Sequence, residues 1–408
     1  MNCRHCRTSL EATFVDLGAA PPSNAYLTKE SLERPETTFP LKVKVCTNCW
    51  LVQTEDYAHF ADLFDEDYAY FSSLSKSWLN HSKNYVRQMI NRFGLTSDSL
   101  VADVAANDGY LLQYFQENAI PCYGVEPTAP SARVARAKGL EIIEEFFGVE
   151  LGLELVKQYK QVALVAANNV LAHVPDINDF VCGFQKVLKK NGVATFEFPH
   201  LLELVTNNQF DTIYHEHFSY LSLIAVKQIF EANDLSIFDV EQLSSHGGSL
   251  RVFVQRSDTK PFEISTKVAE IVDLETDAGV SGEDFYAGFQ TKAELIKDDF
   301  VAFLIEAKKS GASIGAYGAA AKGNTLMNFA GVRPDLIPYV VDLNSEKQGK
   351  FMPGSRIPIV NEDHLKRDQP DLVVILPWNL KTEIMKQLSY IRDWGGQFVV
   401  AVPELSVE

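Results

Sequence analysis

The segment IYHEHFSY, residues 213–220, concentrates side chains that can move a proton or hold a metal. It places Tyr214, His215, Glu216, His217 and Tyr220 within eight positions. A neutral imidazole suits general-base catalysis because its ordinary pKa lies near 6.5. A tyrosine hydroxyl can donate to a developing oxyanion, and a carboxylate can stabilise a protonated imidazole. The segment therefore contains the parts of an acid/base site.

Two other interpretations fit the same residues. In an extended segment His215 and His217 share one face, so both can bind a divalent metal together with Glu197 or His200. A satisfied buried polar cluster is the third interpretation, in which His215 only packs or holds the loop. The residues alone leave these three open.

Four of the six cysteines form two C-x-x-C pairs near the N-terminus. Cys3 and Cys6 are separated from Cys46 and Cys49 by 39 residues. Two such pairs can close a tetrahedral thiolate site for zinc, whereas four unligated thiols would leave two separate pairs without a reason. Because four thiolates leave no open position for water, we expect a structural zinc ion.

Alternating strands and helices follow in the middle of the chain. DSLVADVAANDGYLLQYFQENA predicts a buried strand over residues 100–104, a turn with Asn107 and Gly109, and a helix from about Tyr110. CYGVEPTAPSARVARAKG repeats this plan, with Glu126 at the tip of its strand. This pattern indicates an α/β sheet, in which small ligands bind beyond the carboxyl ends of the strands.

The polar strand tips indicate the class of cofactor. An acidic tip fits a dinucleotide or S-adenosylmethionine, but the turn after the first strand lacks the spaced glycines that hold a pyrophosphate. The next strand, in QVALVAANNVLAHVPD, ends at Asn168 and Asn169 before His173, an order typical of class I methyltransferases. A further strand is predicted in NGVATFEFPH. Together these features favour S-adenosylmethionine.

A second α/β unit is predicted near the C-terminus. GASIGAYGAAAKGNTLMNF gives a strand ending at Tyr317, a loop of small residues with Lys322 and Asn324, and then a helix. Small residues let backbone amides approach a phosphate, and Lys322 adds a positive charge. Strands follow in IPYVVDLN and DLVVILPWN, and GGQFVVAVPE closes the sheet. A dinucleotide-binding domain and a purely structural sheet remain alternatives.

Size and charge limit the partners. The chain has 408 residues, 46% hydrophobic composition and a formal net charge of −17. We expect two or three domains, and we expect no extended contact with nucleic acid or an anionic membrane, because both require a basic surface. The sequence contains no apolar run of roughly 18 residues and starts without the apolar core of a signal peptide, which predicts a cytoplasmic protein with a small-molecule partner.

The order of these motifs resembles the nucleotide-sugar 3-C-methyltransferases, which make branched deoxysugars such as tetronitrose, mycarose and virenose. VADVAANDGYLL, VEPT, AANNVLAHVPD, GVATFEFPHLLELV and YHEHFSYLS follow the two C-x-x-C pairs in the family's order. The resemblance covers essentially the whole chain, and YHEHFSY is its most specific part. It implies S-adenosylmethionine and structural zinc as cofactors, and a nucleotide-linked 4-keto-deoxysugar as substrate.

The resemblance also implies roles for single residues. It points to His217 as the base that removes the C3 proton, to Tyr214 as the partner of the keto oxygen and to Glu216 as a supporting carboxylate, although Tyr214 and His217 can exchange roles. Further residues expected to line the catalytic pocket are Tyr68, Tyr70 and His173. Residues expected around the cofactor are Ala105, Asn107, Gly109, Glu126, Pro127 and Asn168, with Glu126 on the ribose. Lys322 and Asn324 are expected to bind the nucleotide.

The predicted architecture has three parts. These are a zinc-binding domain (residues 1–66), a class I methyltransferase domain (67–257) and a Rossmann-like domain that helps bind the nucleotide sugar (258–408). An O- or N-methyltransferase of another small molecule is the first alternative function. An RNA-directed zinc-ribbon methyltransferase and a dinucleotide-dependent oxidoreductase are weaker alternatives, and the charge of −17 argues against the RNA-directed one.

Overall fold

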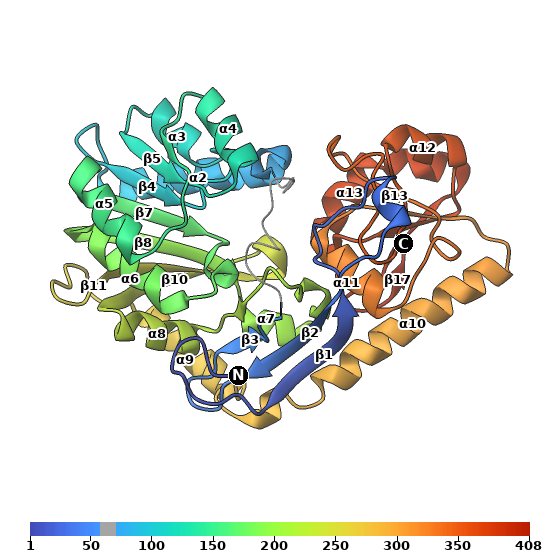
Figure 1. Cartoon of the computed structure of the whole chain (residues 1–408), viewed down its shortest axis with the longest axis horizontal. Coiled ribbons are helices and arrows are strands. Elements are labelled where there is room, and N and C mark those ends of the chain that lie inside the picture. Colours follow the sequence, from blue (N-terminus) through green and yellow to red (C-terminus); the bar gives the residue numbers. More distant parts are fainter. Residues whose placement is uncertain (58–70) are drawn as a thin grey trace.

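The computed structural model describes residues 1–57 and 71–408. The described chain forms three sheets, and Figure 1 shows the two larger ones in separate lobes with the N-terminal strands beneath and between them. The α/β class and the three-part architecture expected from the sequence are confirmed. Within the described ranges, none of the helices combines the length and apolarity needed to cross a bilayer.

The N-terminal sheet is antiparallel and has the order β1-β2-β3-β9. Three of its strands come from the cysteine-containing segment, and the fourth comes from the end of the IYHEHFSY motif. The strands are β1 (Thr13–Ala20), β2 (Phe39–Val45), β3 (Val52–Thr54) and β9 (Ser219–Tyr220). The motif is therefore part of two units at once, because β9 joins the small sheet while the chain on either side belongs to the central lobe.

The central sheet has seven strands in the order β10-β11-β8-β7-β4-β5-β6. Strands β4 to β8 run parallel, and the last two are antiparallel additions at one edge. The strands are β4 (Val101–Val104), β5 (Cys122–Val125), β6 (Ile142–Ile143), β7 (Val162–Asn168), β8 (Leu188–Pro199), β10 (Leu235–Leu243) and β11 (Ser249–Arg256). After β4 the chain adds β5 and β6 on one side of it and then β7 and β8 on the other side. This reversal of strand order creates a crevice at the carboxyl ends of β4 and β7.

Helices cover both faces of the central sheet, as the alternation of apolar residues along buried strands requires. Val101 packs in the cluster beneath α2 and α3, whereas Ala102 and Val104 pack on the opposite face with α5 and α6. The helices of this lobe are α2 (Lys76–Phe93), α3 (Leu112–Glu117), α4 (Ala129–Ala137), α5 (Val149–Tyr159), α6 (Ile177–Val187), α7 (Leu201–Thr206), α8 (Leu223–Ala232) and α9 (Thr266–Asp277). Helix α9 packs on this lobe through Val268 and Ile271, although it follows residue 258.

The C-terminal sheet has the order β14-β13-β12-β15-β16-β17. Its strands are β12 (Ile314–Tyr317), β13 (Val340–Val341), β14 (Ile359–Val360), β15 (Leu372–Ile375), β16 (Gln397–Val400) and β17 (Ser406–Val407), and its helices are α10 (Phe289–Lys309), α11 (Ala321–Phe329), α12 (Glu362–Asp368) and α13 (Lys381–Gln387). The expectation that GGQFVVAVPE closes the sheet is wrong by one strand. The chain turns back after β16, and β17 pairs antiparallel with it at the edge.

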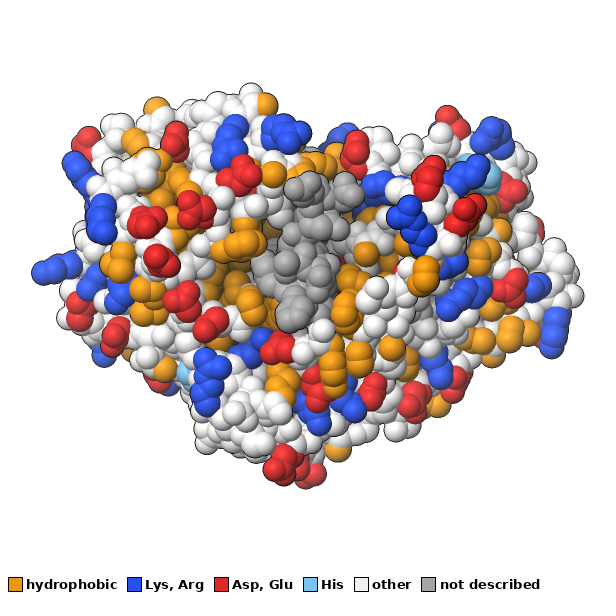
Figure 2. Space-filling model, in the orientation of Figure 1, with side chains coloured by type: hydrophobic (Ala, Val, Ile, Leu, Met, Phe, Trp, Pro, Cys, Tyr) orange, Lys and Arg blue, Asp and Glu red, His pale blue; other side chains and the backbone are white. Residues whose placement is uncertain are grey.

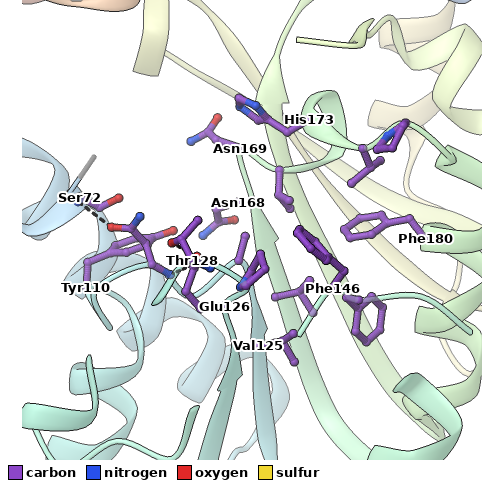
Figure 3. A pocket seen from close by; sticks show the side chains of 18 of the residues that line it. Ser72, Tyr110, Val125, Glu126, Thr128, Phe146, Asn168, Asn169, His173 and Phe180 are labelled. Carbon is purple, nitrogen blue, oxygen red and sulfur yellow. Dashed lines mark hydrogen bonds between the residues drawn. The ribbon is translucent and has the colours of Figure 1, made fainter. Parts of the chain in front are cut away.

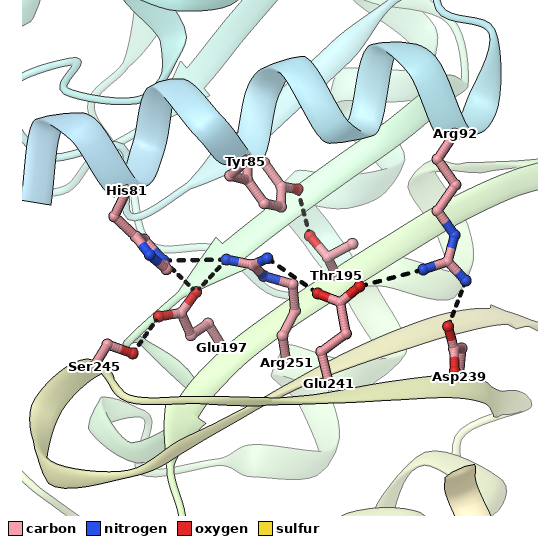
Figure 4. A network of polar contacts seen from close by, with 9 residues as sticks. All are labelled: His81, Tyr85, Arg92, Thr195, Glu197, Asp239, Glu241, Ser245 and Arg251. Atoms are coloured by element: carbon pink, nitrogen blue, oxygen red, sulfur yellow. Dashed lines mark hydrogen bonds and ion pairs between the residues drawn. The ribbon is translucent and has the colours of Figure 1, made fainter.

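A row of buried charges joins the antiparallel strands to α2 (Figure 4). Arg251 on β11 lies opposite Glu197 on β8 and Glu241 on β10, at 2.8 Å and 3.3 Å from their carboxylate oxygens. His81 on α2 contacts Glu197 at 2.9 Å, and the Arg251 guanidinium lies 4.8 Å from the centre of the Tyr85 ring. Burial by itself would raise the pKa of Glu197, but the contacts with His81 and Arg251 lower it to about 2.

On the face shown in Figure 2, Lys and Arg side chains are interspersed with Asp and Glu. This face carries no continuous basic tract of the kind that follows a phosphate backbone.

The buried row of charges gives the first prediction. Arg251→Met should lower the free energy of unfolding by about 3–5 kcal/mol, because it leaves the Glu197 carboxylate buried without its cation. Guanidinium chloride denaturation followed by tryptophan fluorescence measures this. The control is Glu241→Gln, whose side chain is 30% exposed and should cost less than about 1 kcal/mol. Equal losses in the two variants would contradict the analysis.

Candidate active site

A cavity of about 420 Å³ lies at the crevice of the central sheet (Figure 3). Five residues expected around a cofactor line it, and they come from the loops after β4, β5 and β7. They are Ala105, Asn107, Glu126, Pro127 and Asn168. Gly109, which was also expected there, is not among the lining residues. A volume of this size suits a small-molecule ligand.

The loop after β4 approaches the cavity through residues in the left-handed conformation. Ala105 and Asn107 have φ angles of +61° and +49°, and Gly109 has a φ of +76°. A Cβ atom on Gly109 would lie 2.3 Å from Leu140 Cδ1 and 3.3 Å from Ala135 Cβ on α4, so glycine suits both the left-handed backbone and the close packing of the loop. The structure thus gives Gly109 a place in forming the turn.

Glu126 at the end of β5 holds the same loop in place. Its carboxylate accepts hydrogen bonds from the backbone N–H groups of Asn107 and Thr128, both at 2.9 Å, and from the Thr128 hydroxyl. Burial raises the pKa of Glu126, and these three bonds oppose that rise. Because two carboxylate oxygens offer about four acceptor sites, the side chain retains capacity for a donor from a ligand, such as a ribose hydroxyl.

The far side of the cavity presents amide oxygens. Asn168 Oδ1 and Asn169 Oδ1 are buried, and no described residue donates to either of them. Among the described residues, no lysine or arginine lines this cavity. Unpartnered acceptors without a cation fit a cofactor that carries an ammonium and a sulfonium group and lacks phosphate, as S-adenosylmethionine does.

His217 lies beyond the cavity wall formed by His173, and the two ring centres are 4.6 Å apart. His217 Nδ1 lies 3.0 Å from the backbone oxygen of Thr212. Since a carbonyl oxygen can only accept, Nδ1 carries the proton and the neutral ring keeps its lone pair on Nε2. Burial lowers the pKa of His217 well below its ordinary value, and the neighbouring His173 lowers it further. The imidazole is therefore neutral and able to accept a proton.

Tyr214 and His173, two of the residues expected in the catalytic pocket, both lie against this imidazole. The Tyr214 ring lies 4.0 Å from the His217 ring, centre to centre, so the two rings pack against each other. Burial lowers the pKa of His173 to about 4, and the backbone carbonyl of Glu216 partly offsets this. His173 is therefore also neutral at physiological pH. Tyr68 and Tyr70 lie outside the described residues.

Glu216 does not contact either imidazole through its carboxylate among the described residues. The side chain turns to the N-terminal segment, where Asn24 Nδ2 donates to Oε1 at 3.2 Å, and its Oε2 is buried without a described partner. Burial raises the pKa of Glu216 to about 7. The sequence predicted that Glu216 supports an imidazole. Its carboxylate instead contacts the N-terminal part of the chain, which also carries the four cysteines.

The alternative metal site is not formed. His215 Nε2 lies 3.2 Å from the Phe39 carbonyl, and His200 pairs with Glu275 at 2.6 Å. Glu197 belongs to the row of charges around Arg251. Within residues 1–57 and 71–408, the only group of metal-ligating side chains close enough to share one ion consists of the four cysteines.

The C-terminal domain reaches into the same region. Lys322 Nζ donates to Asn379 Oδ1 at 2.7 Å and lies 4.6 Å from the centre of the Trp378 ring. Burial lowers the pKa of Lys322, whereas the nearby Asp211 raises it. Asn324 is buried and donates to the Ser23 carbonyl at 2.6 Å, so in this structure it ties the domain to the N-terminal segment.

Two further contacts were not expected from the sequence. Trp378 Nε1 donates to the buried Asp211 Oδ2 at 2.8 Å, and Thr325 Oγ1 donates to the Ile213 carbonyl at 2.7 Å. Both contacts hold the stretch that contains the Thr212 carbonyl, the partner of His217. The sequence feature that could have indicated a role for Trp378 is its position in the loop after a buried strand, β15. Loops at this end of the strands carry functional groups in α/β folds.

The four cysteine sulfurs lie within 4.8 Å of one another. Cys3 and Cys49 are separated by 3.5 Å between sulfurs, and so are Cys6 and Cys46. Tetrahedral zinc with Zn–S bonds of 2.3 Å requires sulfur separations of about 3.8 Å, so the arrangement fits a zinc ion bound by all four thiolates. His5 is bonded to Asn178 at 2.8 Å and points to no fifth ligand position.

The zinc site is linked directly to His217. Strand β3 begins three residues after Cys49 and pairs with β9, in the register Val52 opposite Tyr220. Thr54, at the end of β3, donates its backbone N–H to the Phe218 carbonyl at 3.2 Å and its hydroxyl to the His217 carbonyl at 3.3 Å. Zinc bound by the four cysteines would therefore stabilise β3 and, through it, the backbone of His217 and Phe218.

An acidic strand tip, unpartnered amide acceptors and a cavity whose described lining residues include no lysine or arginine define an S-adenosylmethionine-dependent methyltransferase. Three family models match in chain order: "Putative zinc binding domain" over residues 3–64, "Methyltransferase domain" over 78–240 and "C-methyltransferase C-terminal domain" over 244–403. The C-methyltransferase NovU of Streptomyces niveus is 34% identical over 402 residues, which are 98% of this chain and 95% of that protein. The chain belongs to this family of C-methyltransferases.

Solved structures resemble the chain more distantly. The PH0226 protein from Pyrococcus horikoshii OT3 is 14% identical over 46% of this chain and 95% of its own, with a TM-score of 0.39. The magnesium protoporphyrin IX methyltransferase of Synechocystis PCC 6803 is 15% identical over 44% of this chain and 83% of its own, with a TM-score of 0.35. Likeness at this level adds nothing to the assignment.

The link from the cysteine cluster to the backbone of His217 gives a second prediction. Cys49→Ser should release zinc, lower the melting temperature and reduce methyl transfer, because β3 would no longer hold β9 in place. Metal analysis, calorimetry and a methylation assay measure these effects. The control is Cys182→Ser, which lies outside the cluster and should retain zinc and activity. A zinc-free Cys49→Ser protein with full activity would refute the link.

The carboxyl of Glu216 gives a third prediction. Its pKa is about 7 in the folded protein against an ordinary value of 4.5, so wild-type stability is lost as the pH rises through 7. Between pH 4.5 and pH 8 the unfolding free energy of wild type should therefore fall by about 3 kcal/mol relative to that of Glu216→Gln, which carries no carboxyl at this position. Denaturant titrations of both proteins across this range measure the difference. A stability difference that does not change with pH would contradict the raised pKa.

Proposed function

We propose that the protein methylates C3 of a nucleotide-linked 4-keto-deoxysugar through an enolate, with S-adenosylmethionine as the methyl donor. The observation that supports this most directly is the His217 imidazole, which is held neutral with its Nε2 lone pair available and lies one ring from the cofactor cavity. Transfer to carbon needs a base to create the nucleophile. The motif order that resembles sugar 3-C-methyltransferases supports the substrate class.

The chemistry divides among few groups. His217 Nε2 takes the C3 proton, and the electron pair of the broken C–H bond moves to form an enolate with its charge on the C4 oxygen. Tyr214, whose ring packs against that of His217, donates to that oxygen. S-adenosylmethionine, when bound, supplies an electrophilic methyl group and leaves as the neutral thioether. The imidazolium of His217 then returns its proton to water.

The low pKa of His217 in the free protein is consistent with this role. Burial disfavours the imidazolium, so nearly every molecule holds the basic form at neutral pH. The developing negative charge of the enolate stabilises the imidazolium at the moment of transfer. The balance between these two effects sets the driving force of proton removal.

The remaining assignments concern the nucleotide. Lys322 brings the buried positive charge of the C-terminal domain toward His217, whose pKa it lowers, and we assign it to the substrate's pyrophosphate. Asn324 would act by holding the loop of small residues against Ser23. We keep the division into residues 1–66, 67–257 and 258–408 as a functional one, in which the last part binds the nucleotide.

A hydrogen-exchange experiment tests the proposal. In deuterated water, wild-type protein should introduce deuterium at C3 of a thymidine diphosphate 4-keto-6-deoxyhexose without S-adenosylmethionine and add one methyl group with it. His217→Asn should lose both activities by at least about 100-fold, as expected when a general base is removed. Mass spectrometry follows both products.

The matched control is His215→Asn, which removes the neighbouring imidazole bonded to the Phe39 carbonyl and should retain exchange. Methyl transfer without any exchange, in wild type and with Tyr214→Phe fully active, would favour an O- or N-methyltransferase. Absence of both reactions with thymidine and guanosine sugars would overturn the sugar assignment.

A further inference from the structure

We propose that His246 is a further catalytic residue, whose imidazole hydrogen-bonds an oxygen of the substrate sugar where the cofactor cavity meets the C-terminal domain. This inference rests on the proposed function, because it names the sugar as the missing partner. His246 lines the same cavity as Glu126 and Asn168 and belongs to the SSHGGS turn between β10 and β11.

The backbone of His246 has an unusual conformation. Its φ and ψ angles are 55° and 20°, in the left-handed region that a histidine rarely adopts, and the next two residues, Gly247 and Gly248, have φ angles of +90° and +116°. The turn is closed by a bond from Gly248 N–H to the Ser245 carbonyl at 3.0 Å. Ser245 Oγ donates to Glu197 at 2.8 Å, which anchors the turn to the buried row of charges.

Groups from both lobes fix this turn. A Cβ atom on Gly247 would lie 2.5 Å from the Trp378 ring, so only glycine allows the C-terminal domain to approach this closely. Gln209 Nε2 donates to the Gly247 carbonyl at 2.8 Å. On the other side the Trp78 ring meets the His246 ring edge to face at 5.2 Å. The turn therefore holds one imidazole in a defined place at the junction of the lobes.

One nitrogen of the His246 ring lacks a hydrogen-bond partner. His246 Nδ1 is buried, and no described residue hydrogen-bonds it. A buried polar atom without a partner is costly, so a hydrogen bond from a ligand to this nitrogen would be favourable. The side chain is only partly buried overall, so part of the ring faces the cavity. A ligand in the cavity is the partner that the ring lacks.

The surroundings of His246 favour the sugar over the cofactor. Burial lowers the pKa of His246 to about 4, and the charge of Lys322 lowers it further. His246 in turn lowers the pKa of His217. The contacts agree with this. His173, which lines the same cavity as His246, lies 4.6 Å from the His217 ring, and Trp378, which packs against Gly247, lies 4.6 Å from Lys322. A neutral imidazole there can donate to, or accept from, a hydroxyl or keto oxygen of the sugar.

His246→Asn is the sharpest test, because asparagine adopts the left-handed conformation more readily than histidine and should preserve the turn. We expect kcat/KM for the thymidine diphosphate 4-keto-6-deoxyhexose to fall by roughly 10- to 100-fold, with C3 deuterium exchange falling in parallel. The dissociation constant of S-adenosylhomocysteine, measured by calorimetry, should change by less than about twofold. His246→Gly, which also suits the backbone, should behave similarly.

The outcomes separate the two proposals. If wild type exchanges deuterium and His246→Asn matches it, the inference about His246 is wrong and the proposed function stands. If His246→Asn weakens S-adenosylhomocysteine and leaves exchange intact, His246 belongs to the cofactor site and the inference is again wrong. If wild type itself neither exchanges nor methylates the sugar, the proposed function fails and the inference fails with it.

Discussion

The hydrogen bond from His217 Nδ1 to the Thr212 carbonyl is the contact on which the rest of the site depends. It decides which nitrogen of the ring holds the lone pair, and a ring turned over would present a proton to the substrate instead. Thr212 is held by its own bonds to the Gln209 carbonyl, and its neighbours Asp211 and Ile213 are bonded to the C-terminal domain. The geometry of one imidazole thus depends on contacts from both lobes.

The site also depends on keeping its imidazoles uncharged. Burial lowers the pKa of His173, His217 and His246 below the physiological range. A sulfonium cofactor carries a positive charge, and an imidazolium beside it would be repelled in a medium of low polarity. Neutral rings avoid this repulsion and still offer donors and acceptors. Lys322, a partly buried lysine of the C-terminal domain, is the cation assigned to the phosphates.

The sequence predicted what local pattern can encode. Apolar runs with polar tips predicted the parallel strands and the crevice, and two cysteine pairs predicted the zinc site with all its ligands. It could not show that β9 leaves the central lobe, because two residues carry no periodicity. Nor could it place Trp378 beside Asp211 or turn Glu216 toward Asn24, since those contacts arise from the packing of segments more than 160 residues apart. His246 was overlooked because its strain is a property of the folded turn.

The pairing of β3 with β9 has a consequence for how the chain is made. Val52 cannot pair with Tyr220 until Tyr220 has been synthesised. At 5–20 residues per second a ribosome needs roughly 8 to 34 seconds to reach it. During that interval the edge of β3 has no neighbour, and an open edge is a place where nascent chains pair wrongly. All four cysteines are already synthesised by then, so metal can fold the small sheet early and hold that edge in shape. Biosynthesis therefore favours an order in which zinc is bound first and the segment around His217 is assembled afterwards.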